Sequence, residues 1–242
     1  MRSILLCTLL LISVHVCAQF TDSTQRMINF TSSGILNKTN DGRSYVFNNA
    51  IRFGLKKKSL EFNSGASYIY GQNQTRLTNN DFSSFLDFNL YKTFPGFYYW
   101  GLAGFDKSYS LKINRRFQTG LGVAYNFINV ENAYVNLSNG ILYEASNLQL
   151  TDSTVSSYET LRNSMRLRMR FVMKKNIVFE TANFWQPSLS DREDYILKST
   201  AGISVKLIRW LSFTTALTFN KLNQTRRENL LLTFGLTMEN FF

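Results

Sequence analysis

The sequence closes on Asn229-Leu-Leu-Leu-Thr-Phe-Gly-Leu-Thr-Met-Glu-Asn-Phe-Phe242, and this stretch decides the fold. Counted back from the end, six of seven alternate residues are large and apolar: Phe242, Met238, Leu236, Phe234, Leu232 and Leu230, with Asn240 the exception. The residues between them are mostly small or polar. A period of two predicts a β-strand with one apolar face and one polar face.

This last strand also has the pattern of an assembly signal. It resembles the C-terminal strand of Gram-negative outer-membrane barrels, which alternates in the same way and ends on Phe. The resemblance implies that the barrel assembly machinery reads Phe234, Leu236, Met238 and Phe242. The alternative is an ordinary edge strand of a soluble sheet, because alternation by itself is common.

Composition favours strands and selects no partner. The 242 residues suffice for one domain with a large core or one membrane barrel. An aromatic content of 15% with only two prolines favours β-structure. The formal charge is +11, but there is no dense basic run within a nucleic-acid motif, so no nucleic-acid partner is expected.

The N-terminus has the features of a secretory signal peptide. Residues 1–18 combine Arg2, an apolar core and a small residue, Ala18, at the expected cleavage site. The predicted organisation is therefore a cleaved signal at 1–18 and an outer-membrane β-barrel at 19–242. Cys17 is alternatively the acylated cysteine of a lipoprotein, although the bulky Val16 before it disfavours that reading.

Cleavage would remove every cysteine and the only histidine, His15. Disulfides and thiolate catalysis are then excluded from the mature chain. Triads that need an imidazole are excluded as well. A pair of carboxylates without histidine remains conceivable, but no spacing selects one. We therefore expect no enzyme activity, no cofactor and no metal site.

Period-two runs follow one another after the signal, and we count twelve. They cover 26–37, 43–55, 59–71, 81–92, 97–107, 114–127, 133–146, 159–174, 176–187, 194–206, 209–221 and 229–242. A tilted strand that crosses a bilayer needs about 9–11 residues, and most of these runs are at least that long. The predicted fold is all-β: a closed antiparallel transmembrane β-barrel of about twelve strands.

The connections between these runs differ in length. The short ones include Lys56–Lys58 and the turn around Lys175, whereas longer polar ones are expected at 72–80, 147–158, 188–193 and 222–228. Outer-membrane barrels have short periplasmic turns and longer outer loops. With both chain ends in the periplasm, the short set falls on the periplasmic side.

The two faces of most strands can be assigned from parity. Apolar residues such as Phe117, Leu121 and Val123 are expected to face lipid, with polar residues such as Gln118 and Asn136 in the lumen. The strands at 97–107 and 176–187 could not be assigned. Aromatic residues near strand ends are expected to form interfacial girdles: Phe94, Phe97, Tyr98, Tyr99, Trp100, Trp185, Trp210 and Phe242.

Four arginines share one face of the run at 159–174: Arg162, Arg166, Arg168 and Arg170. Placing them in lipid would cost roughly 2–4 kcal/mol each near the midplane, so they are expected to line the lumen. Arg52, Glu61, Glu144 and Glu180 are expected to line it too. The arginines either attract anions or pair with inward carboxylates, and Arg170 should lie opposite Glu180.

Three stretches carry a family resemblance: Phe117–Tyr125, Leu161–Phe171 and Phe184–Tyr195. Together with the strand rhythm they resemble the salt-induced outer-membrane proteins of domain-of-unknown-function family 481. The resemblance implies an architecture and a location, with no established activity to transfer.

Two functions stay open. One is a narrow channel for small, preferentially anionic solutes. The other is a closed structural or interaction barrel whose outer loops bind a partner. The acidic loop Asp191–Asp194 is either a solvated outer loop or a site for a divalent cation. The expected partners are outer-membrane lipid and the barrel assembly machinery; the solute or protein partner is open.

Overall fold

The computed structural model describes residues 25–39, 42–91, 94–151, 154–174 and 176–241. Within them the chain forms twelve strands and no helix. The strands are β1 (Gln25–Thr39), β2 (Gly42–Lys57), β3 (Leu60–Asn73), β4 (Arg76–Leu90), β5 (Phe97–Ser108), β6 (Ile113–Val130), β7 (Ala133–Gln149), β8 (Val155–Met173), β9 (Ile177–Pro187), β10 (Tyr195–Ile208), β11 (Leu211–Leu222) and β12 (Arg227–Phe241). The predicted signal peptide, Cys17 and Phe242 lie outside the described residues.

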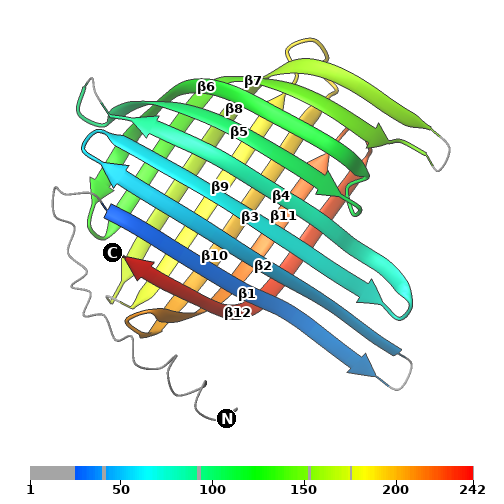
Figure 1. The fold of residues 1–242 in the computed structure, drawn as a ribbon, viewed down its shortest axis with the longest axis horizontal. Coiled ribbons are helices and arrows are strands. Elements are labelled where there is room, and N and C mark those ends of the chain that lie inside the picture. Colours follow the sequence, from blue (N-terminus) through cyan, green and yellow to red (C-terminus); the bar gives the residue numbers. More distant parts are fainter. Residues whose placement is uncertain (1–24, 40–41, 92–93, 152–153, 175, 242) are drawn as a thin grey trace, which may run out of the picture.

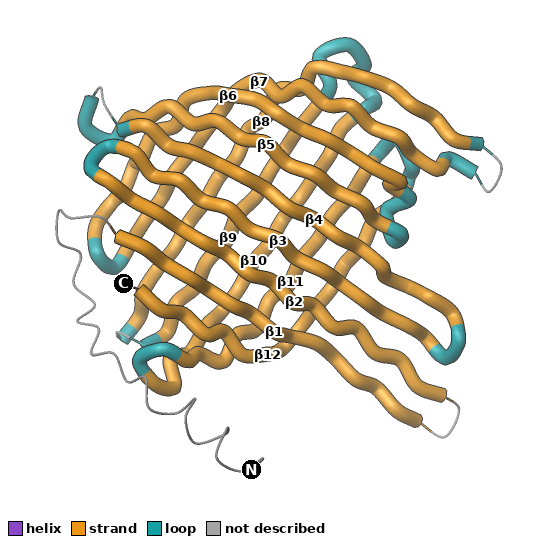
Figure 2. Tube along the Cα trace, viewed as in Figure 1, coloured by secondary structure: helices purple, strands orange, loops and turns teal. Residues whose placement is uncertain are grey.

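The strands form a closed barrel in which each pairs with its sequence neighbours, and β12 returns to pair with β1 (Figures 1 and 2). All pairs are antiparallel. The closed antiparallel barrel of twelve strands predicted from the sequence is confirmed. No helix in the described part of the chain is long and apolar enough to cross a membrane.

The strands extend further than the sequence pattern indicated, and this corrects the prediction for the connections. β3 and β4 are joined by a turn at 74–75 where a longer loop at 72–80 was expected, because β4 begins at Arg76. The connection after β7 likewise shrinks to 150–154. Polar residues at these strand ends still pair in the sheet. Alternation of loop length is therefore a weaker indicator of barrel topology than the sequence pattern suggested.

Contacts across the lumen identify the inner face. Lys198 on β10 reaches Asp106 on β5 at 3.5 Å, although these strands are not neighbours in the barrel. Residues that pair in register lie on the same face of the sheet. Lys198 pairs with Phe184, and Phe184 pairs with Arg166, so all three side chains face the lumen. The alternate residues face outward and are largely apolar and exposed, among them Phe47, Ile51, Phe117, Leu121, Leu217, Leu232 and Leu236.

The two strands that sequence parity left unassigned are resolved by this register. β5 directs Tyr98 and Trp100 inward, where both are buried, and β9 directs Phe184 inward. The expectation that Tyr98 and Trp100 belong to an interfacial girdle was therefore wrong. Tyr99, Trp185 and Trp210 are 44%, 46% and 50% exposed, as outward girdle residues should be.

Candidate functional site in the barrel lumen

The lumen has two parts that differ in packing. We call the end where β1 begins and β12 ends the terminal end, and the opposite end, with the β5–β6, β7–β8, β9–β10 and β11–β12 connections, the far end (Figure 1). Inward side chains toward the far end are packed against one another. Inward side chains toward the terminal end include arginines that solvent reaches.

Arg162 is the centre of a buried polar network in the far half. Its side chain is fully buried, with Nε donating to Glu144 Oε2 at 2.9 Å and Nη2 donating to Asp194 Oδ2 at 2.7 Å. Nη2 also donates to Glu144 Oε1 and to the Tyr158 hydroxyl, both at 3.1 Å. Glu144 further accepts from Gln118, Ser146 and Tyr158. Most hydrogen-bonding groups of the two buried charges are thereby satisfied, as burial requires.

Asp194 belongs to the β9–β10 connection at 188–194, so its ion pair with Arg162 holds this connection against the inner face of the barrel. Burial raises the pKa of the Asp194 carboxyl above its ordinary value, and the hydrogen bond from Arg162 acts in the opposite direction. Asp194 is only 2% exposed, whereas Asp191, Arg192 and Glu193 are exposed, so the solvated-loop reading holds for three of the four residues and fails for Asp194. Among the described residues no cluster of His, Cys, Asp and Glu could hold a metal ion.

A second charged group joins opposite walls. Arg116 on β6 donates to Asp106 on β5 through Nη2 at 2.6 Å and Nε at 3.1 Å, and Lys198 approaches Asp106 from β10. Arg116 is 2% exposed. Lys198 thereby bridges the lumen between β10 and the paired strands β5 and β6, with which β10 shares no sheet contact.

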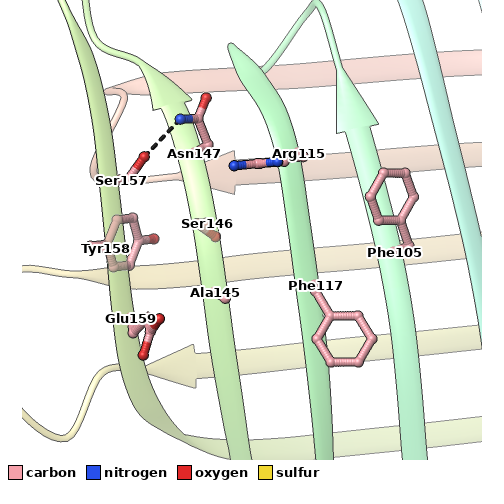
Figure 3. Close-up of a pocket in the computed structure, with 9 residues that line it drawn as sticks. All are labelled: Phe105, Arg115, Phe117, Ala145, Ser146, Asn147, Ser157, Tyr158 and Glu159. Atoms are coloured by element: carbon pink, nitrogen blue, oxygen red, sulfur yellow. Dashed lines mark hydrogen bonds between the residues drawn. The ribbon is translucent and has the colours of Figure 1, made fainter.

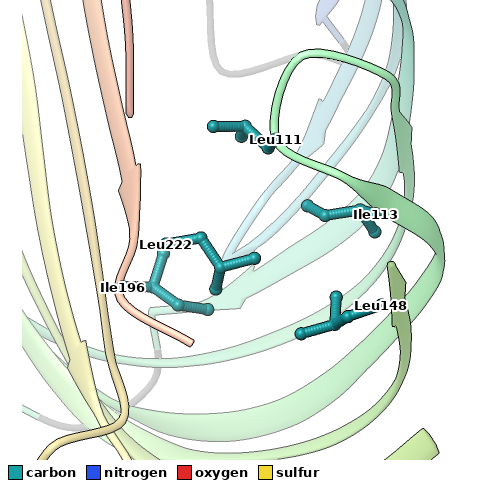
Figure 4. Close-up of a cluster of buried hydrophobic side chains, with 5 residues drawn as sticks. All are labelled: Leu111, Ile113, Leu148, Ile196 and Leu222. Carbon is teal, nitrogen blue, oxygen red and sulfur yellow. The ribbon is translucent and has the colours of Figure 1, made fainter. Parts of the chain in front are cut away.

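Apolar residues pack across the same region. Leu111, Ile113, Leu148, Ile196 and Leu222 form one buried cluster contributed by β6, β7, β10, β11 and the β5–β6 connection (Figure 4). Thr225, in the β11–β12 connection, donates to the Leu111 carbonyl at 3.1 Å, and Asn229 donates to Ser110 at 3.0 Å. The β5–β6 connection thus folds inward and reaches the opposite wall. We call this cluster and its contacts the plug.

The terminal half has the opposite character. Arg52 on β2 and Arg168 on β8 face inward, and both are exposed, so the lumen beside them is open to solvent. They come from opposite sides of the barrel, six strands apart, and interact electrostatically with each other. Neither makes an ion pair within the described part of the chain.

Arg166 lies between these two environments. Its Nε donates to the Ser138 hydroxyl at 3.3 Å, and its guanidinium stands 5.8 Å from the centre of the Phe184 ring. Arg170 pairs with Glu180 at 2.8 Å, and the two side chains are 45% and 59% exposed. The register places Arg170 directly opposite Glu180, as the hairpin predicted.

The carboxylates on the β3–β4 wall are engaged by neutral donors. Asn63 donates to Asp87 at 2.9 Å and to Glu61 at 3.0 Å, and the Tyr91 hydroxyl donates to Glu61 at 3.2 Å. Among the described residues neither carboxylate forms an ion pair with an arginine, so the pairing alternative does not apply to them. Asp87 still lies within electrostatic range of Arg166 and Arg168 across the lumen.

An aromatic layer narrows the lumen beside β5–β7. Tyr98, Trp100, Ala124 and Leu142 form a second buried cluster, against which Tyr91 packs. Trp100 fits there because Gly122 and Gly140, which pair with each other, leave room for its ring. A methyl group on Gly122 would stand 2.6 Å from Trp100 Cζ2.

The structure places the predicted site residues as follows. Arg162 and Glu144 belong to the packed network, whereas Arg52, Arg168, Arg170 and Glu180 line the solvated half. The proposed assembly residues Phe234, Leu236 and Met238 face outward and are 43%, 42% and 45% exposed; Phe242 lies outside the described residues. Sequence reasoning missed Arg116, Asp106, Lys198 and the plug, and it did not connect Asp194 with Arg162. Leucines and isoleucines at inward positions near strand ends were the signal available for the plug.

These features define a closed twelve-stranded barrel with a polar, partly solvated lumen and an apolar exterior. Its fold is similar to that of the NanC porin, with 7% identity, a TM-score of 0.54, and coverage of 89% of this chain and 99% of that one. The translocator domain of the autotransporter NalP from Neisseria meningitidis gives 11% identity, a TM-score of 0.49, and coverage of 98% and 95%. The KdgM porin has 10% sequence identity and a TM-score of 0.47, and the match covers 88% of this chain and 98% of that one.

A family model matches residues 33–239, and the chain belongs to the family described as protein of unknown function, DUF481. No curated protein matches the sequence. The family expected from the sequence is confirmed, and it assigns no reaction or ligand.

Proposed function

We propose that this protein is an outer-membrane channel for small solutes whose lumen favours anions. Membrane lipid and the barrel assembly machinery are its partners in this proposal, which involves no catalysis, cofactor or nucleic acid. The apolar exterior supports the membrane location. Leu121, Ile141 and Leu230 point outward and are 71%, 53% and 66% exposed, and lipid is the environment that such a surface requires.

The observation that carries the proposal is the pair Arg52 and Arg168. They face each other across a lumen that solvent reaches, and neither has an ion-pair partner in the described ranges. Unpaired guanidinium groups along an aqueous path attract anions and repel cations. The nearby carboxylates Asp87 and Glu61 are negative, so the preference for anions should be modest.

The plug leaves one side of the far end uncovered. The residues that contact the plug belong to strands between β4 and β12 and to their connections. At the far end of β1, by contrast, the inward residue Ile35 is 44% exposed. In the proposal, solute enters the solvated half and passes the plug along the wall formed by β1–β3.

The test is the reversal potential of the refolded protein in a planar bilayer under a salt gradient. The native barrel should prefer chloride over potassium, and the variant with both Arg52→Gln and Arg168→Gln should lose that preference. Arg43→Gln is the matched control, because Arg43 is an exposed arginine on the outer face, and it should behave like the native protein. A native channel without anion preference, unchanged in the double variant, contradicts the proposal.

A closed barrel is the second candidate, and the plug is the observation that favours it. Arg162 is fully buried with Glu144, and five apolar side chains cross the far half. If the plug fills the whole section, the protein does not conduct and its connections act as a binding surface. Absence of any conductance from correctly folded protein would decide for this candidate.

A further inference from the structure

The outer surface carries a depression on β5–β8 that the channel does not use (Figure 3). It has a volume of about 460 Å³ and lies toward the far end. Phe105, Phe117 and Ala145 supply its apolar part, and Arg115, Ser157 and Glu159 supply the polar part. Phe105, Phe117, Ala145 and Glu159 form one register row across four neighbouring strands.

The depression straddles the edge of the apolar exterior. Toward the middle of the barrel the same face continues with Leu121, Ile141 and Met165, which are 71%, 53% and 38% exposed. Toward the far end the next row pairs Arg115 with Asn147, and Asn147 with Ser157. A molecule bound here therefore meets an apolar surface on one side and a polar surface on the other.

The polar row is ordered and contains an unpaired cation. Asn114 donates to Asn147 at 2.8 Å, and Asn147 donates to Ser157 at 2.7 Å, so the row is held in place by its own hydrogen bonds. Arg115 is exposed and makes no ion pair among the described residues. In Figure 3 its guanidinium extends from β6 toward β7 and Asn147.

We propose that this depression binds a phosphorylated glycolipid of the surrounding membrane. An acyl chain packs on Phe105, Phe117 and Ala145, and the phosphate accepts hydrogen bonds from Arg115. Sugar hydroxyls donate to Glu159 and Ser157. The proposal rests on the membrane location proposed above and is independent of whether the barrel conducts.

Glu159 favours a sugar over a simple anionic phospholipid. A carboxylate accepts hydrogen bonds from hydroxyl groups, whereas it repels a headgroup that offers only negative charge. A glycolipid that carries phosphate, hydroxyls and acyl chains satisfies Arg115, Glu159 and the aromatic surface together.

The test is lipid retention by the folded barrel in detergent, measured by native mass spectrometry. The probes are lipid A, which is a phosphorylated and acylated glucosamine disaccharide, its dephosphorylated form, and phosphatidylglycerol. Lipid A should be retained most tightly. Arg115→Gln should weaken its retention by about tenfold or more, because a hydrogen bond to a charged group is worth roughly 1.5–3 kcal/mol. Arg43→Gln, an exposed outward arginine at the same end of the barrel, should leave it unchanged.

Ala145→Leu fills the depression and keeps every charge, so it should weaken retention of lipid A as well. Equal retention by the native protein and Arg115→Gln overturns the inference, as does phosphatidylglycerol bound as tightly as lipid A. Conductance of the same preparations separates the two proposals. A barrel that conducts but does not retain lipid A contradicts only this inference. A barrel that retains lipid A but does not conduct contradicts only the channel proposal.

Discussion

Arg162 and Arg170 show that two arginines on one strand face can have opposite energetic roles. Arg162 is fully buried with Glu144 and Asp194, whereas Arg170 and Glu180 are both largely exposed. Removing one partner of a buried ion pair costs about 3–5 kcal/mol because the other charge stays buried. An exposed pair contributes roughly 0–1 kcal/mol.

We therefore predict that Arg162→Leu lowers the free energy of unfolding by about 3–5 kcal/mol, and that Arg170→Leu changes it by about 1 kcal/mol or less. The measurement is denaturant unfolding of the barrel in detergent, with the midpoints of the two variants compared. Similar midpoints would show that the network around Arg162 is not the buried unit described above.

The packing of Trp100 against Gly122 and Gly140 gives a second prediction about stability. A methyl group on Gly140 would stand 2.5 Å from Trp100 Cζ2 and would also meet the Leu121 carbonyl oxygen. Overpacking of this kind costs about 1–3 kcal/mol, so Gly140→Ala should lower the unfolding midpoint. Gly202→Ala is the control, because its nearest neighbour would be the Thr215 carbonyl at 3.6 Å. Equal midpoints for the two variants would mean that Trp100 does not pack on Gly140.

At the scale of elements, the β5–β6 connection is held inward by Asp81 on β4. The Asp81 carboxylate accepts hydrogen bonds from the Ser110 hydroxyl at 2.7 Å, the Ser110 amide at 3.0 Å and the Ser108 hydroxyl at 2.9 Å. In the channel proposal this connection narrows the far end.

Asp81→Ala should release the connection and give larger, noisier single-channel currents. Asn80→Ala is the control, because Asn80 is the outward neighbour of Asp81 and its side chain accepts a hydrogen bond from Tyr68 on the outer face. Identical currents for Asp81→Ala and the native protein would place the plug outside the conducting path.

The alternation of residues made most strands predictable, and the exceptions have a physical cause. In β6, β8 and β12 one face is apolar and the other polar, so parity fixed both the element and its orientation. In β5 and β9 the inner face carries Tyr98, Trp100 and Phe184, and apolar residues on both faces remove the signal. Arg162 and Arg168 have the same parity and the same residue type, so sequence could not reveal that one is buried and the other solvated. That difference depends on side chains from distant strands, Glu144 and Asp194 for Arg162.

The whole barrel has an apolar outer face, which the membrane proposal assigns to lipid, and a polar lumen that solvent reaches in its terminal half. Leu217, at the middle of β11, faces outward and is 43% exposed, whereas Thr200 on β10 faces inward and is exposed to the lumen. Leu217→Arg should destabilise the barrel in a bilayer by about 2–4 kcal/mol, and Thr200→Arg should be tolerated. Refolding into vesicles measures both, and equal tolerance would argue against lipid at the outer face.

The central claim is that the terminal half of the lumen is open to solvent beside unpaired arginines, whereas the plug packs the far half except along β1–β3. The most direct measurement is the reaction rate of Thr200→Cys with charged thiol reagents, with the unsubstituted chain as background for Cys7 and Cys17. Thr200 shares a register row with Arg168, two strands away at about 10 Å. The account predicts that an anionic reagent modifies this cysteine faster than a cationic one of similar size, and that Ser164→Cys, at a position only 5% exposed, stays protected. Equal protection of both cysteines, or faster reaction with the cationic reagent, would contradict it.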